Sequence, residues 1–127
     1  MPGAIPHLII GSLMFIIGSY YFKSYFDGDN KIQKLFLVLV VCLSFSVLPD
    51  FFLIIYYTTY IFPIEVFLQY HNFVYLISGP IAIISLIILK YGINIRTKPI
   101  WIMGMWCIIL HIIMDLFLPH KTLGIWI

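Results

Sequence analysis

Residues 35–57 read LFLVLVVCLSFSVLPDFFLIIYY and indicate the class of fold. These 23 residues contain a single charged side chain, Asp50. A helix rises 1.5 Å per residue, so about 20 apolar residues cross the roughly 30 Å hydrocarbon core of a bilayer. Only a helix can satisfy all backbone hydrogen bonds within one such segment. The stretch therefore predicts a transmembrane helix.

Three further apolar stretches have a similar length, at residues 5–22, 72–89 and 100–118. Over the whole chain 63% of residues are hydrophobic and 9% are charged, whereas soluble domains have about a quarter of their residues charged. The sequence therefore predicts an all-α integral membrane protein, with residues 1–127 forming a single bundle of four transmembrane helices. A net charge of +2 without a basic run argues against nucleic acid as a partner.

The basic residues predict how these helices are oriented. Six of the seven lie in the first and third connections, and the second connection, at about 58–71, has none. The positive-inside rule places the two basic connections in the cytoplasm and leaves both termini and the second connection outside the cell. The expected location is the inner or plasma membrane. The six residues are Lys23, Lys31, Lys34, Lys90, Arg96 and Lys98.

Small residues predict close packing between helices. Gly11 and Gly18 are seven residues apart on the first span, and Ser78 and Ala82 are four apart on the third. Small faces let membrane helices approach closely, although Gly and Ser are also common in spans without such a role. A short interfacial helix is expected to begin near Pro63.

Six ionisable side chains fall in the predicted outer half of the bundle. Asp50 and His111 each lie seven residues before the outer end of a span, roughly 10 Å deep. Lysine and arginine alone predict the orientation of the helices, so the shared depth of these six residues is independent of that prediction. The six are His7, Asp50, His71, His111, Asp115 and His120.

The two buried carboxylates need partners, because an ionised Asp within a membrane costs several kcal/mol when it has none. No Lys or Arg lies in any predicted span. His111 and Asp115 are four residues apart and share one helix face, and imidazole with carboxylate suits Zn²⁺ or another first-row divalent ion. Pro49 should break the backbone bond to Phe45 and bend the second span at this site.

Other interpretations remain open for these residues. A lone histidine at a span end, such as His7 or His71, is often an interfacial residue. The pair of His111 and Asp115 can equally be a structural hydrogen bond. The shared depth of the six groups favours a common metal site.

The segments MPGAIPHLIIG at the start, LPD in the second span, YHN before the third and HIIMDLFLPH in the fourth resemble the YdjM-type membrane-bound metal-dependent hydrolases. These proteins are in turn similar to zinc-dependent phospholipase C. The resemblance implies that Asp50, His71, His111 and Asp115 hold one metal ion. It further implies that His7 joins a bridging Asp115 at a second ion, and that His120 matches a ligand of a third.

The sequence departs from the family in one segment. Members often follow the central histidine with Arg and then a second His, whereas Val74 and Tyr75 stand in this stretch here.

Two functions therefore remain in competition. The first is a metal-dependent hydrolase of a phosphoester or similar lipid-borne bond at the outer face, with Asp50 as ligand or base.

The second is a non-catalytic accessory subunit of a larger membrane protein complex, with a structural or vestigial metal site. Membrane lipid is the expected partner in both cases, together with other membrane subunits in the second. Ion or proton transport is disfavoured, because the predicted inner half of the spans has no ionisable residue to carry a relay.

Overall fold

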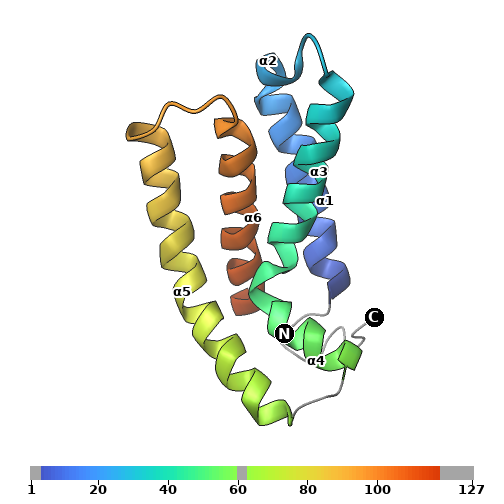
Figure 1. The fold of residues 1–127 in the computed structure, drawn as a ribbon, viewed down its shortest axis with the longest axis vertical. Helices are drawn as coiled ribbons and strands as arrows, with labels where there is room; N and C mark the ends of the chain where they lie inside the picture. Colours follow the sequence, from blue (N-terminus) through green and yellow to red (C-terminus); the bar gives the residue numbers. More distant parts are fainter. Residues whose placement is uncertain (1–3, 60–62, 118–127) are drawn as a thin grey trace.

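The computed structural model describes residues 4–59 and 63–117, which form helices and short connections without a strand (Figure 1). A short 3₁₀ turn, η1, interrupts the helices in the middle of the predicted second span. The elements are α1 (Ala4–Tyr21), α2 (Lys23–Phe26), α3 (Lys31–Val47), η1 (Leu48–Asp50), α4 (Phe51–Thr59), α5 (Ile64–Tyr91) and α6 (Lys98–Phe117).

Three segments are long and apolar enough to cross a membrane: Lys31–Asp50, Glu65–Tyr91 and Lys98–Phe117. The first helix contributes a shorter apolar segment, Ile5–Tyr21. Many large apolar side chains remain exposed along these helices, for example Ile16 at 62% and Leu76 at 73%. Soluble monomers rarely expose such continuous apolar surface. The chain is therefore an all-helical protein whose long apolar helices suit a membrane.

Helix α6 lies in the middle of the molecule and packs against α1, α3 and α5 (Figure 1). The buried core lies mainly between α3 and α6, where Val38 and Cys42 meet Met103 and Cys107. Partly buried side chains of α1, including Met14, pack against this core. The side chains that α6 buries are therefore shared among neighbouring helices, which fixes the rotation of α6 and the direction of its polar residues.

Close packing on the small face of α1 is confirmed. A Cβ atom at Gly11 would lie 2.7 Å from Ser46 Oγ and 2.9 Å from the backbone oxygen of Cys42, and one at Gly18 would lie 2.8 Å from Met103 Cγ. Real Cβ atoms essentially never approach other atoms so closely. The two glycines therefore let α1 approach α3 and α6 at distances that a side chain would prevent.

The break predicted at Pro49 is confirmed. Helix α3 ends at Val47, η1 follows, and α4 then runs in a new direction (Figure 1). The predicted second span, residues 35–57, is therefore divided among α3, η1 and α4. The physical reason is that proline lacks the amide hydrogen a helix needs and its ring crowds the preceding turn.

The short interfacial helix that the sequence predicts to begin near Pro63 is not a separate element. Helix α5 begins at Ile64, directly after Pro63, and runs unbroken to Tyr91. Proline suits the start of a helix, where its missing amide hydrogen would have no partner. No glycine or proline falls between residues 64 and 78, so nothing separates the first turns of α5 from the predicted third span.

The connection that contains α2 and the connection from α5 to α6 lie at the same end of the molecule (Figure 1). The six basic residues that predicted the orientation belong to these two connections or the adjoining helix turns. We call this the basic end. The start of α1, η1, α4 and the last turns of α6 lie at the opposite end.

Candidate metal centre

Four segments of the chain bring polar side chains together at the end opposite the basic end. His7 lies near the start of α1, Asp50 closes η1, and His71 lies about two turns into α5. His111 and Asp115 lie one turn apart near the end of α6. The break at Pro49 matters here, because it places Asp50 where the chain changes direction rather than within a regular helix.

All five of these side chains are removed from solvent. The residue exposures are 0% for His7, 2% for Asp50, 2% for His71 and 0% for His111, and the Asp115 side chain is 5% exposed. Burial of charged or polar groups at this depth costs free energy unless they are paired, hydrogen-bonded or bound to a metal. The burial therefore requires a partner for these groups.

The atoms that face one another are all of the kind that bind metals. His7 Nε2 lies 3.4 Å from Asp50 Oδ2 and 3.4 Å from Asp115 Oδ1. His111 Nε2 lies 3.2 Å from Asp115 Oδ2 and 3.6 Å from Asp50 Oδ1. One ligand atom from each of these four residues lies within 4.8 Å of the others. We call His7, Asp50, His111 and Asp115 the four-residue cluster.

These separations can be compared with those around a tetrahedral cation. Zinc binds imidazole nitrogen and carboxylate oxygen at about 2.0–2.2 Å, so two tetrahedral ligands lie about 3.4 Å apart. The four nitrogen–oxygen distances within the cluster run from 3.2 to 3.6 Å. Since these distances involve both oxygens of each carboxylate, and one ligand atom from each residue lies within 4.8 Å of the others, the groups would draw closer together around a divalent first-row metal ion.

The protonation of His111 follows from a backbone contact. Its Nδ1 atom lies 2.6 Å from the carbonyl oxygen of Ser46. A carbonyl can only accept, so Nδ1 carries the hydrogen and donates it. In the neutral ring, Nε2 then presents a lone pair toward Asp50 and Asp115. Metal-binding histidines are commonly held in this way, with the second ring nitrogen donating to a backbone carbonyl.

The polar atoms of the cluster lack hydrogen bonds to the described part of the chain. This holds for both ring nitrogens of His7, for Nε2 of His111 and for all four carboxylate oxygens of Asp50 and Asp115. Buried polar atoms without hydrogen bonds are rare in proteins, because each costs about 1–3 kcal/mol. A shared cation would satisfy several of these atoms at once.

Protonation of both histidines explains the arrangement less well. The rings of His7 and His111 stack with centroids 3.7 Å apart and an interplanar angle of 13°. Two imidazolium rings at that separation would repel each other. Among the described residues, the ion pairs of the two carboxylates involve histidines and neither Lys nor Arg. A dication offsets both carboxylate charges without charging the stacked rings.

The sequence analysis also named His71 and His120 as candidate ligands and assigned His7 to a second ion. His71 Nδ1 lies 3.7 Å from Asp50 Oδ1, so His71 adjoins the four-residue cluster through Asp50. His7, which the family resemblance implies for a second ion with Asp115, approaches Asp115 as predicted and lies equally close to Asp50. His120 lies outside the described residues.

The sequence did not reveal the part that Ser46 takes in this site. Its carbonyl fixes the His111 ring from the neighbouring helix. A proline in a helix does predict disturbed backbone bonds one turn earlier, which is the only signal the sequence offered. It does not say which side chain uses a freed carbonyl.

The fold and the site together define a class: an all-helical protein with long apolar helices and a buried His/Asp cluster that could hold a metal ion. No protein-family model matches the chain, and searches of curated proteins and of solved structures found no significant match.

Proposed function

We propose that this chain is a membrane-embedded metalloprotein whose four-residue cluster binds a divalent cation, with Zn²⁺ as the preferred ion. The observation that carries the proposal is the convergence of buried ligand atoms from His7, Asp50, His111 and Asp115 within 4.8 Å of one another. The His111 contact to the Ser46 carbonyl supports it, because that contact turns a lone pair toward the same centre.

The proposed setting is a bundle of four transmembrane helices in the cell membrane, with both termini outside. The basic end supports this orientation through the positive-inside rule. The metal cluster then belongs to the outer half of the bundle, where the residues of α1, η1 and α6 meet.

The proposed activity is hydrolysis of a phosphoester or similar lipid-borne bond. A bound zinc ion supplies a water whose pKa is lowered toward 7 and polarises the scissile group. Asp50 faces both histidine rings of the cluster, so it can serve as a ligand or accept the proton of that water. The similarity to YdjM-type hydrolases supports this reaction class.

An apolar cavity beside the cluster supports a lipid substrate. It has a volume of about 260 Å³ and lies between α3, α5 and α6. Leu48, Val74 and Ile108 contribute to its lining, one turn or less from Asp50, His71 and His111 in sequence. An acyl chain in this cavity would hold a lipid next to the cluster.

The test is turnover by the purified, zinc-loaded protein in nanodiscs that contain phospholipid, measured as release of the headgroup. We expect turnover that a chelator abolishes. Asp50→Asn should lower the rate by about 10²–10⁴-fold if Asp50 acts as the base. Asp29→Asn, which removes a carboxylate from the connection before α3, serves as the matched control and should leave the rate unchanged.

A second candidate is a non-catalytic accessory subunit in which the metal only braces the helices. The burial of the cluster favours it, because exposures of 0–5% leave little room for substrate. A protein that binds zinc stoichiometrically, gains thermal stability from it and releases no headgroup would support this candidate over the hydrolase.

A further inference from the structure

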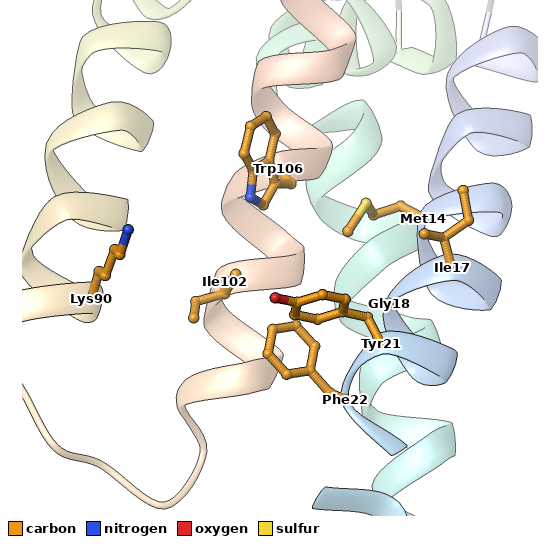
Figure 2. Close-up of a pocket in the computed structure, with 8 residues that line it drawn as sticks. All are labelled: Met14, Ile17, Gly18, Tyr21, Phe22, Lys90, Ile102 and Trp106. Carbon is orange, nitrogen blue, oxygen red and sulfur yellow. The ribbon is translucent and has the colours of Figure 1, made fainter. Parts of the chain in front are cut away.

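A second feature of the molecule lies near the basic end, away from the metal cluster. A cavity of about 430 Å³ opens between the last turns of α1 and the facing parts of α5 and α6 (Figure 2). Its volume lies within the roughly 300–1,000 Å³ of small-molecule sites. The lining residues are Met14, Ile17, Gly18, Tyr21, Phe22, Lys90, Ile102 and Trp106.

The body of the cavity is apolar and opens toward the surroundings of the bundle. Ile17 is 63% exposed, Trp106 is 43% exposed and Tyr21 is 79% exposed. Aromatic side chains that combine an apolar ring with a polar tip are enriched where a bilayer meets water. The position of Tyr21 at the end of α1 and the apolar rings below it match a site that runs from the membrane interface into the hydrocarbon.

One positive charge faces this apolar body. Lys90 lies in the last turn of α5, and its ammonium group extends from α5 toward the side on which α6 lies (Figure 2). Its ammonium lies 5.0 Å from the Tyr91 ring centroid, and it forms no ion pair within residues 4–59 and 63–117. Among the described residues, no acidic side chain lines the cavity. The exposed ammonium is therefore free to pair with an anion from outside the described chain.

A second lysine reinforces the charge at this end. Lys98 Nζ lies 3.4 Å from the backbone oxygen of Lys90, which places the Lys98 ammonium beside the last turn of α5. The hydroxyl of Tyr21 extends into the space between α1 and α6 (Figure 2). An apolar cavity lined by one ammonium group and a tyrosine, with a second ammonium beside the same turn of α5, forms the pattern that an anionic phosphate with attached acyl chains would fit.

We propose that this cavity binds an anionic phospholipid, with an acyl chain against Ile17, Ile102 and Trp106 and the phosphate near Lys90. Charge complementarity decides between occupants. A second copy or a partner helix that filled the cavity with apolar side chains would leave Lys90 without a counterion in a poorly solvated place. Anionic lipids are also abundant in the leaflet that faces the basic connections of membrane proteins.

The experiment uses the full chain with Trp106 as its only tryptophan, made by Trp101→Phe and Trp126→Phe. The protein is reconstituted in phosphatidylcholine vesicles that contain a minor fraction of either dibromo-phosphatidylglycerol or dibromo-phosphatidylcholine. Bromine quenches a nearby indole, so the quenching of Trp106 measures which lipid occupies the cavity. We expect an apparent affinity for phosphatidylglycerol that is roughly fivefold higher for each lysine engaged.

Two charge-removing variants make the test specific. Lys90→Gln should reduce the preference for phosphatidylglycerol by roughly fivefold. Lys31→Gln removes a charge from the start of α3 at the same end but outside the cavity, and it should keep the preference. Both positions are exposed, so neither variant is expected to disturb folding, which circular dichroism would verify.

Three results would overturn the proposal. Equal quenching by the two brominated lipids in the parent would mean ordinary contact with bulk lipid. Weak quenching by both, together with cross-linking at residue 17 between chains, would mean that a second copy fills the cavity. An equal loss of preference in the lysine variants at positions 90 and 31 would assign the selectivity to general surface charge.

Discussion

The imidazole ring of His7 stacks on that of His111, with ring centroids 3.7 Å apart. The two rings come from helices at opposite ends of the sequence, and each presents Nε2 to the carboxylates of Asp50 and Asp115. Stacking keeps both rings in one orientation, and the Ser46 carbonyl fixes the second of them. Two positively charged rings at this separation would repel each other, and the His111 ring is held as metal-binding histidines commonly are.

Asp115→Asn tests this interpretation through metal content and stability. The amide keeps the shape but removes a charge that offsets the cation, so bound zinc should fall well below the parent level. Metal that binds only the folded protein stabilises it by about 2.7 kcal/mol at a free metal concentration one hundred times the Kd. The variant should lose this stabilisation. Elemental analysis and thermal unfolding with and without added zinc measure both effects.

The matched control is Asp27→Asn, which changes an exposed carboxylate in the connection before α3. It should retain zinc and melt like the parent. A parent that contains no metal, together with an Asp115→Asn variant that loses only about 1 kcal/mol, would instead assign His111 and Asp115 to a structural hydrogen bond.

The sequence predicted which residues gather in the cluster, because ionisable residues are rare in apolar helices and therefore informative. An apolar chain has few reasons to place Asp50, His111 and Asp115 in its helices, and their depth along the spans followed from simple residue counting. The helical class and the break at Pro49 followed from equally local rules.

The rest depended on how helices are rotated against one another. Counting residues along a span predicts how deep a side chain lies in the membrane, but not the direction in which it points around the helix axis. It therefore could not predict that His7 would face both carboxylates while His71 lies near that of Asp50. The path of α4 and the early start of α5 depend on tertiary packing of a segment whose composition suits both a span and an interfacial helix.

Gly11→Ala should destabilise the packing of α1 on α3. The added methyl group would lie 2.9 Å from the backbone oxygen of Cys42, which cannot move away without shifting α3. Overpacking costs about 1–3 kcal/mol, which exceeds the gain of up to about 1 kcal/mol from replacing glycine in a helix. The midpoint of unfolding in a detergent titration should therefore fall.

Gly79→Ala is the control for that experiment. There the new methyl group would lie 3.2 Å from Ile112 Cδ1, the end of a flexible side chain that can give way. The helix-propensity gain then dominates, and we expect the midpoint to stay constant or rise. If Gly11→Ala were as stable as Gly79→Ala, the close approach of α1 and α3 would have no energetic importance.

The proposed orientation can be tested with single cysteines at Asn30 and Thr59. Asn30 lies in the connection before α3 at the basic end, and Thr59 closes α4 at the opposite end. Cys42 and Cys107 are buried, so they should react little in the folded protein. An impermeant maleimide added to intact cells should label the cysteine at position 59 and spare the one at position 30. The reverse pattern would place the metal cluster on the cytoplasmic side.

Pro49→Ala tests whether the helix break builds the metal site. Alanine restores the missing amide and favours continuation of α3 through η1, which would rotate Asp50 away from His7 and His111. It would also redirect the Ser46 carbonyl from His111 Nδ1 toward the helix's own amides. Loss of such supporting contacts typically weakens metal binding by about 10–100-fold.

Pro80→Ala provides the comparison, because Pro80 also lies inside an apolar helix but is exposed on α5, about two and a half turns beyond His71. It removes a proline without touching the cluster, so zinc affinity should remain that of the parent.

Competition with a chelator of known affinity measures both variants in the same detergent. Equal zinc affinity in the two variants and the parent would show that Asp50 reaches the cluster without the break. A similar loss in both would indicate a general effect of helix straightening on the bundle. Weaker binding in Pro49→Ala alone is the result we expect, because only that proline controls the direction of a carboxylate within the cluster.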